Sequence, residues 1–225
     1  MAVTADVTRP DLARLYLGTR ERLLALLAEL DDAGLATPVP ACPGWAVRDV
    51  VAHLCAVSQD VLAGRQTGIP TDEETAAQVS RFAGVNLAGI LAAWAPAAPR
   101  FGQLVGDLTV WPAVIDIASH EQDIRGAVGR PGARDTDVIR LASGRILGWL
   151  RPPVPLRITV EDAEFRVGPE DGTELRLATT RFEAFRWRMG RRSRTQLAAL
   201  DWSGDPAPVL EHLTIFGPSP ADIIE

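Results

Sequence analysis

The sequence contains no lysine, and all 23 of its basic residues are arginine. A mechanism that forms a Schiff base on a lysine side chain is therefore excluded. Only two cysteines are present, Cys42 and Cys55. Together they form neither a Cys-x-x-Cys redox motif nor a zinc knuckle, and we expect both to stay reduced. Cys55 lies among apolar residues, which predicts a small core side chain.

A basic surface and long apolar segments are also missing. The 29 acidic residues outnumber the arginines and give a net charge of −6, so we expect no binding to nucleic acid. No window has the ~20 uninterrupted apolar residues that a membrane span needs. The first residues do not show the pattern of a secretory signal. We therefore expect a cytoplasmic protein that acts away from membranes, as a monomer or a homodimer.

Helices are predicted for the first two-thirds of the chain. Apolar residues recur there at helical spacing. The segment 71–96 fits either one long helix or a broken pair, and residues 37–45 are a proline-rich connector. The predicted helices cover residues 9–35, 46–65, 71–96, 112–128 and 137–150.

The pattern changes after the proline-rich segment 151–155. Two segments that alternate apolar and polar residues follow and predict two or three strands. A helix over 181–190 and a shorter helix within 205–216 complete the chain. The fold class is therefore predicted as α+β. A four-helix bundle over residues 1–151 precedes a small α/β domain over residues 152–225, and both sizes are usual for domains.

A histidine stands among acids in the segment DIASHEQDIRGAVG, residues 116–129. On a helix, Asp116 and His120 lie one turn apart on the same face, beside an apolar stripe that should partly bury them. A buried charge needs a partner. Two interpretations meet that need. One is a structural hydrogen bond between the two side chains, and the other is a shared metal ion with a carboxylate and an imidazole ligand.

A second histidine, His53, lies on the flank of the apolar face of the helix predicted over 46–65. Taken singly, it is interpreted as a core histidine with one hydrogen bond. Side chains of facing helices in a bundle can, however, meet at one ion. Three protein ligands and an open position are typical of catalytic metal sites. His53, Asp116 and His120 are therefore the candidate metal ligands, whereas His212 is predicted to be a packing or surface residue.

Three segments resemble parts of one family in their order and spacing. PGWAVRDVVAHL (43–54) resembles the start of its second helix, and DIASHEQDIRGAVG resembles its later metal-binding helix. RWRMGRRSRTQLAALDWSGDP (186–206) is similar to part of its C-terminal domain, which has a sterol-carrier-like fold. The family is that of the mycothiol-dependent maleylpyruvate isomerases, within the DinB-like bundle superfamily. The resemblance covers nearly the whole chain and implies that the bundle is DinB-like.

The resemblance also implies a divalent metal, expected to be zinc, held by His53, Asp116 and His120. The isomerase has a glutamate where this chain has Asp116, so the ion is expected to lie closer to its helix or to bind more weakly. Asp123 is expected to orient the imidazole of His120 or to take a proton. Glu121, on the neighbouring stripe, is expected to make a helix contact or a salt bridge.

Mycothiol is the second cofactor that the resemblance implies. A metal with an open position can hold this low-molecular-weight thiol as a thiolate, which would attack a small electrophilic substrate. The expected activity is thus that of a metal-dependent, mycothiol-using S-transferase or isomerase. The alternative is a non-catalytic protein that binds a metal and a small molecule. No protein side chain is assigned as catalytic.

Arginines form a run in RWRMGRRSRTQ, residues 186–196. They can belong to a solvated surface or pair with acids of the bundle. Alternatively, their guanidinium groups can clamp a carboxylate of a substrate. Under that interpretation the substrate-binding candidates are Arg191 and Arg192, together with Arg81 from the segment 71–96.

Overall fold

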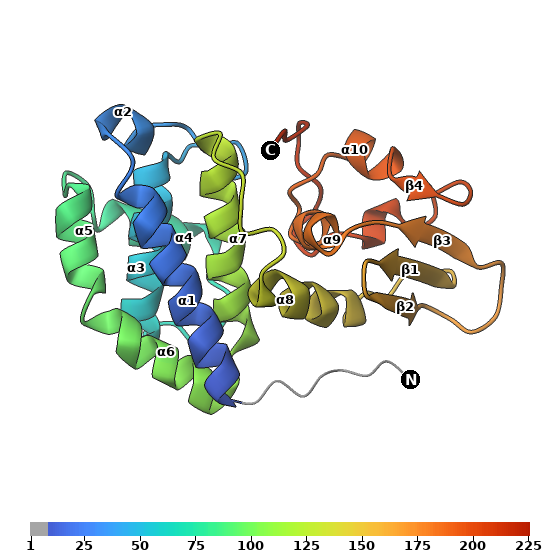
Figure 1. Cartoon of the computed structure of the whole chain (residues 1–225), viewed down its shortest axis with the longest axis horizontal. Coiled ribbons are helices and arrows are strands. Elements are labelled where there is room, and N and C mark those ends of the chain that lie inside the picture. Colours follow the sequence, from blue (N-terminus) through green and yellow to red (C-terminus); the bar gives the residue numbers. More distant parts are fainter. Residues whose placement is uncertain (1–8) are drawn as a thin grey trace. The chain divides into compact units, whose positions relative to one another are not determined.

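The computed structural model describes residues 9–225, and side-chain environments from Leu12 onward. Helices α1 to α7 come first, and helix α8, a four-stranded sheet and two further helices follow (Figure 1). The chain forms two compact units, one that ends at Pro131 and one over residues 132–225. No helix within the described residues is long and apolar enough to span a membrane.

Four long helices build the bundle of the first unit. Helices α1 and α3 each pack against both α6 and α7. Their inward faces bury apolar side chains such as Leu23, Val50, Phe101 and Ile117, and each fully buried side chain of this kind contributes about 1.5–3 kcal/mol. Cys55 is buried, as predicted. The helices are α1 (Arg9–Leu27), α3 (Val47–Leu62), α6 (Ala97–Leu108) and α7 (Trp111–Ala127).

Helix α6 is the bundle member that the sequence did not predict. Proline at 99 and glycine at 102 and 106 lower the helix propensity of this segment. Pro99 is tolerated because it lies in the first turn, where its missing N–H has no helical partner. A Cβ at Gly102 would lie 3.0 Å from Cγ of Leu17 on α1. The glycine therefore lets α1 and α6 approach closely.

Short helices fill the connections between the long ones. The segment 71–96 is a broken pair, α4 (Asp72–Ser80) and α5 (Leu87–Trp94). A capping box begins α4, in which the Thr71 hydroxyl accepts from the N–H of Glu74 and the Glu74 carboxylate accepts from the N–H of Thr71. The segment 9–35 is also divided, because α1 ends at Leu27 and α2 (Asp32–Leu35) follows.

The second unit contains a mixed sheet with the strand order β2-β1-β3-β4. Strand β1 is antiparallel to β2 and parallel to β3. Helix α9 packs against α8, and the core includes Leu147, Ile158 and Trp187. The elements are α8 (Asp137–Gly148), β1 (Leu156–Val160), β2 (Ala163–Val167), β3 (Leu175–Ala178), α9 (Arg181–Arg188), α10 (Arg194–Ala198), β4 (Asp201–Trp202) and a 3₁₀ turn (Leu210–His212).

The α+β fold class is thus confirmed, with two differences in detail. The compact units divide at Pro131, whereas the sequence placed the boundary after residue 151. Helix α8 belongs to the second unit because it packs on α9 and on strand β2. The helix expected within 205–216 is reduced to the 3₁₀ turn, in a segment that has a proline at 206 and another at 208.

Candidate metal centre

Two neighbouring helices of the bundle bring three candidate ligands together. His53 lies on α3, and Asp116 and His120 lie one turn apart on α7. The Nε2 atom of His120 is 3.5 Å from Oδ1 of Asp116, and Nε2 of His53 is 3.8 Å from Oδ2 of the same carboxylate. The two imidazole centroids are 5.2 Å apart. Both rings therefore present the same nitrogen to one carboxylate.

The three side chains differ in their exposure to solvent. His53 and His120 are 4% and 7% exposed, whereas the side chain of Asp116 is 35% exposed. The ring of Trp45 lies 5.2 Å from the ring of His53 and 6.4 Å from that of His120. The Trp45 ring thus lies beside both imidazoles, and Asp116 is the most exposed of the three candidate ligands.

A carboxylate fixes the orientation of the His120 ring. Oδ2 of Asp123 lies 3.0 Å from Nδ1 of His120. An ionised carboxylate only accepts hydrogen bonds, so Nδ1 carries the hydrogen. In the neutral ring the lone pair is then on Nε2, the atom that faces Asp116. Metal-binding histidines usually have this pairing with a carboxylate, which gives Asp123 the position expected of it.

His53 has an uncharged partner instead. Its Nδ1 lies 3.0 Å from Oε1 of Gln78 on α4, and Gln78 is 3% exposed. The sequence did not single out Gln78, because a glutamine in a polar segment such as DEETAAQVS carries no charge or apolar pattern that marks a site.

Cys42 is a further neighbour that sequence reasoning did not place here. Its Sγ lies 3.8 Å from Nδ1 of His120 and 3.6 Å from Oδ2 of Asp123. Cys42, His120 and Asp123 form a second group that is close enough to hold an ion. An ion there would take Nδ1 of His120 and displace the hydrogen bond to Asp123. The group with His53 requires no such loss, so it is the better candidate.

The charges of the site act strongly on one another. Burial by itself raises the pKa of Asp116, but the adjacent imidazoles of His120 and His53 outweigh it and hold that pKa below its usual range. Burial lowers the pKa of His120, yet Asp116 and Asp123 together raise it well above 6.5. Without an ion, the two carboxylates thus favour the protonated form of the His120 imidazole.

The donor atoms suit a divalent metal ion, for which zinc serves as the example. Zinc binds imidazole nitrogen and carboxylate oxygen at about 2.0–2.2 Å, so two ligand atoms on a tetrahedral ion lie roughly 3.3–3.6 Å apart. The separations of 3.5 and 3.8 Å between the imidazole nitrogens and Asp116 are close to that value. Three protein ligands leave the fourth position for another molecule.

The N-terminal part of the chain matches a known family. Residues 17–114 match the family described as the mycothiol maleylpyruvate isomerase N-terminal domain. The resemblance predicted from the sequence is therefore confirmed for this part of the chain. The matched range includes His53 on α3 and ends two residues before Asp116. The acid and histidine of α7 consequently lie beyond it. Among curated proteins, no match was found.

Two similar solved structures have the same fold. A crystal structure of the mycothiol-dependent maleylpyruvate isomerase has a TM-score of 0.56 and 18% identity, over 85% of this chain and 92% of that chain. A histidine-to-alanine mutant of that isomerase has a TM-score of 0.54 and 16% identity, over 84% of this chain and 92% of that chain. At this identity the likeness is evidence for the fold.

The predicted substrate-binding arginines all contact other groups. Arg81 donates to Oδ2 of Asp60 at 2.8 Å, within the bundle. In the second unit, Arg192 donates to Glu183 at 2.8 Å and to Glu225 at 3.2 Å, and Arg191 donates to a backbone carbonyl at 2.6 Å. These contacts favour structural roles, and substrate binding by these residues stays a prediction.

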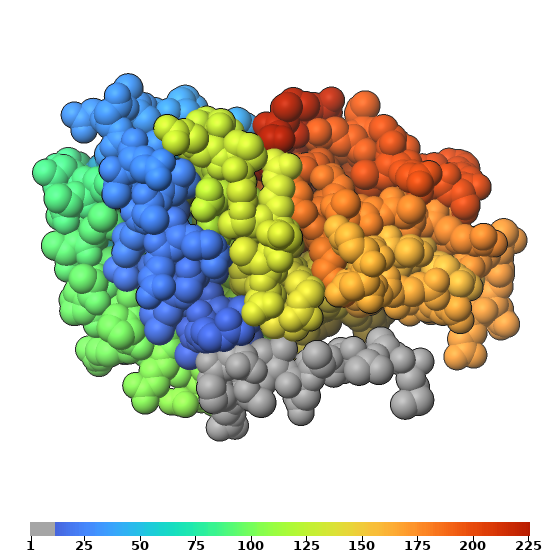
Figure 2. All heavy atoms as spheres, in the orientation of Figure 1, coloured from blue at the N-terminus to red at the C-terminus, as the bar shows by residue number. Residues whose placement is uncertain are grey.

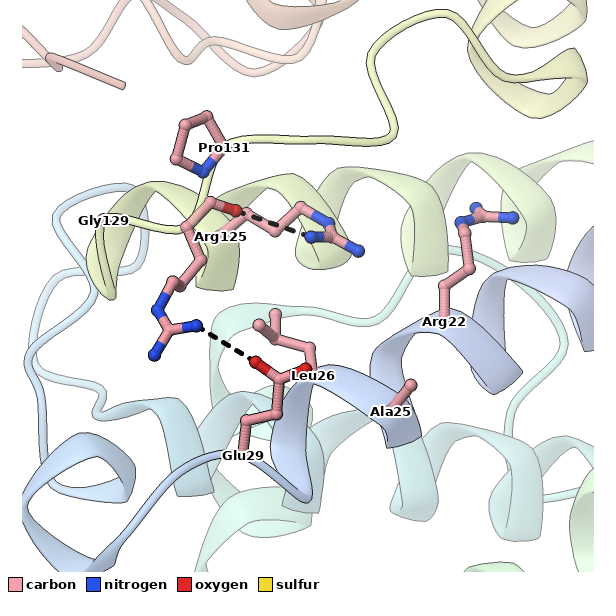
Figure 3. A pocket seen from close by; sticks show the side chains of 8 residues that line it. Arg22, Ala25, Leu26, Glu29, Arg125, Gly129 and Pro131 are labelled. Atoms are coloured by element: carbon pink, nitrogen blue, oxygen red, sulfur yellow. Dashed lines mark hydrogen bonds and ion pairs between the residues drawn. The ribbon is translucent and has the colours of Figure 1, made fainter.

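Glu121 lies on the other stripe of α7 and forms salt bridges there, as expected. Its carboxylate binds Arg22 of α1 at 2.7 Å and Arg125 at 3.1 Å. Helix α1 runs beside α7 on the face seen in Figure 2. The arginines also line a hollow of about 430 Å³ at the end of α7 (Figure 3). Arg130 lines the same hollow and binds Glu29. Since carboxylates already neutralise these guanidinium groups, we assign this hollow no ligand.

Proposed function

We propose that the protein is a metal-dependent enzyme that uses mycothiol, as an S-transferase or an isomerase of a small electrophilic substrate, and that zinc is its ion. One observation carries this proposal. The Nε2 atoms of His53 and His120 converge on the carboxylate of Asp116. The domain match over residues 17–114 and the similarity to two structures of the mycothiol-dependent maleylpyruvate isomerase support mycothiol as the thiol and this class of reaction.

The residues of the chain prepare the site for an anionic sulfur. A divalent ion held by His53, Asp116 and His120 would lower the pKa of a thiol at its open position and stabilise the thiolate. Asp123 holds hydrogen on Nδ1 of His120, which keeps Nε2 available as a donor atom. The Trp45 ring lies beside both imidazoles, and Asp116, the most exposed of the three candidate ligands, would leave an entrance. The chain needs no nucleophilic cysteine of its own in this scheme.

Metal content tests the first half of the proposal. The purified protein should hold close to one zinc ion per chain, and His53→Ala should empty the site because two ligands bind zinc far more weakly than three. His212→Ala is the matched control, since His212 is exposed on the 3₁₀ turn of the second unit. Metal analysis and far-ultraviolet circular dichroism report occupancy and fold. A wild-type protein that takes up no zinc, nickel or manganese would overturn the site.

Thiol consumption tests the second half. With zinc bound, mycothiol should be consumed by S-transfer to electrophiles, or should accelerate isomerisation of a cis-unsaturated acid without net consumption. His53→Ala should abolish both reactions. A protein that holds zinc but promotes neither reaction would instead be the non-catalytic binding protein.

A further inference from the structure

We propose that Gln78 is a positioning residue of the metal centre, which fixes the hydrogen of His53 on Nδ1 and so directs the lone pair of Nε2 at the ion. The proposal rests on the metal site proposed above. It extends that site to α4, a helix that contributes no ligand. It is supported by the hydrogen-bond partners of the Gln78 amide, which allow only one orientation of that group.

The amide of Gln78 has only one orientation that satisfies its neighbours. Its Nε2 donates to Oε1 of Gln66 at 2.8 Å and to Oδ2 of Asp60 at 3.3 Å. The reversed amide would point its oxygen at the Asp60 carboxylate and leave that carboxylate without this donor. The oxygen Oε1 must therefore face His53, 3.0 Å from Nδ1. Since Oε1 only accepts, Nδ1 of His53 must donate.

Two arginines bind Asp60, the last member of this hydrogen-bond network counted from His53. Asp60, at the end of α3, accepts from Arg65 at 2.6 Å and from Arg81 at 2.8 Å. These guanidinium groups lower the pKa of Asp60 against the effect of its burial. The carboxylate is thereby kept ionised and acts only as an acceptor toward Gln78. Arg81 thus acts on the site indirectly, through Asp60 and Gln78.

The packing of α4 agrees with this role. All of helix α4 lies within the described residues, and Gln78 is its one buried residue. A buried glutamine in place of an apolar residue gives up apolar burial and must be fully hydrogen-bonded. Helix α4 therefore presents its single inward side chain to His53 rather than to the apolar core.

The experiment uses the full chain, freed of metal and labelled with ¹⁵N at histidine. Long-range ¹H–¹⁵N spectra at about pH 8 distinguish hydrogen on Nδ1 from hydrogen on Nε2, and competition titrations give the affinity for zinc. In the wild type, His53 should carry its hydrogen on Nδ1. In Gln78→Leu that preference should be lost, and the zinc affinity should fall roughly 10–100-fold, as is usual when such a partner of a ligand is removed.

Two variants control for general loosening of the bundle. Gln78→Glu keeps an acceptor for Nδ1, so it should keep the wild-type tautomer and bind zinc more tightly than Gln78→Leu. Gln59→Leu makes the same exchange on α3, where Gln59 donates to the carbonyl of Ala93 at 3.2 Å, and should change neither measurement. An Nε2-protonated His53 in the wild type would overturn the inference, and so would a Gln78→Leu protein with unchanged tautomer and affinity. Absence of zinc binding in the wild type would reject the metal site itself. The tautomer of His53 in the wild type and in Gln78→Leu would still show whether Gln78 sets the position of the hydrogen.

Discussion

His120 is the residue at which a proton and the proposed metal ion would compete. Its Nε2 faces Asp116 and its Nδ1 faces Asp123, so the doubly protonated ring can donate to both carboxylates. Burial opposes this charge, but the carboxylates prevail and raise the pKa of His120 well above 6.5. In the metal-free protein the two carboxylates consequently favour the charged ring. Protonated His120 then stabilises the metal-free fold below about pH 6.5, and that contribution is lost as the pH rises through the raised pKa.

Zinc affinity should therefore increase with pH. An ion takes the lone pair of Nε2, so about one proton leaves His120 per zinc bound, and the affinity rises roughly tenfold per pH unit up to the raised pKa. Titrations between pH 6 and 8, and calorimetry in buffers of different ionisation enthalpy, measure both effects. Asp123→Asn removes one of the two carboxylates, so its pH dependence should shift to lower pH. An affinity that stays flat over this range would show that His120 is not charged in the metal-free protein.

Helical spacing in the sequence predicted the candidate ligands, but it predicted only some of the residues that contact them. Asp116 and His120 are four residues apart on a helix, and His53 flanks an apolar stripe, so sequence periodicity could bring all three into view. Gln78 and Cys42 could not be found in that way. Each reaches the site from a different segment, and only the packing of α4 and of the 37–45 connector determines which side chain points at an imidazole.

At the scale of elements, close packing of α1 on α6 depends on one glycine. Because a Cβ at Gly102 would already press on Leu17, Gly102→Leu should destabilise the protein by about 1–3 kcal/mol through overpacking. Gly18 on α1 has open space around its Cα, so Gly18→Leu should stabilise by up to about 1 kcal/mol through helix propensity. Urea unfolding of both variants measures the difference. Equal effects of the two substitutions would show that the helices do not meet at Gly102.

Gly102 also explains why helix α6 was not predicted from the sequence. Local propensity counts glycine and proline against a helix, while tertiary contact favours glycine where two backbones come near each other. The other long helices were predicted because apolar residues recur along them at helical spacing. The second unit was predicted as strands and a helix because alternation along β1, β2 and β3 is regular. The compact units divide before α8 because α8 packs on α9, which is a contact distant in sequence.

At the scale of the whole molecule, all three candidate ligands lie in the first of the two compact units. An ion that binds only the folded state stabilises it by about 2.7 kcal/mol when its free concentration is a hundred times the dissociation constant. Zinc should therefore raise the unfolding temperature of helices α1–α7 and leave that of residues 132–225 unchanged. Calorimetry with and without zinc measures the shift, and hydrogen exchange assigns it to a unit. In His53→Ala the shift should vanish. Equal protection of residues 132–225 by zinc would mean that the ion binds elsewhere, or that the two units unfold together.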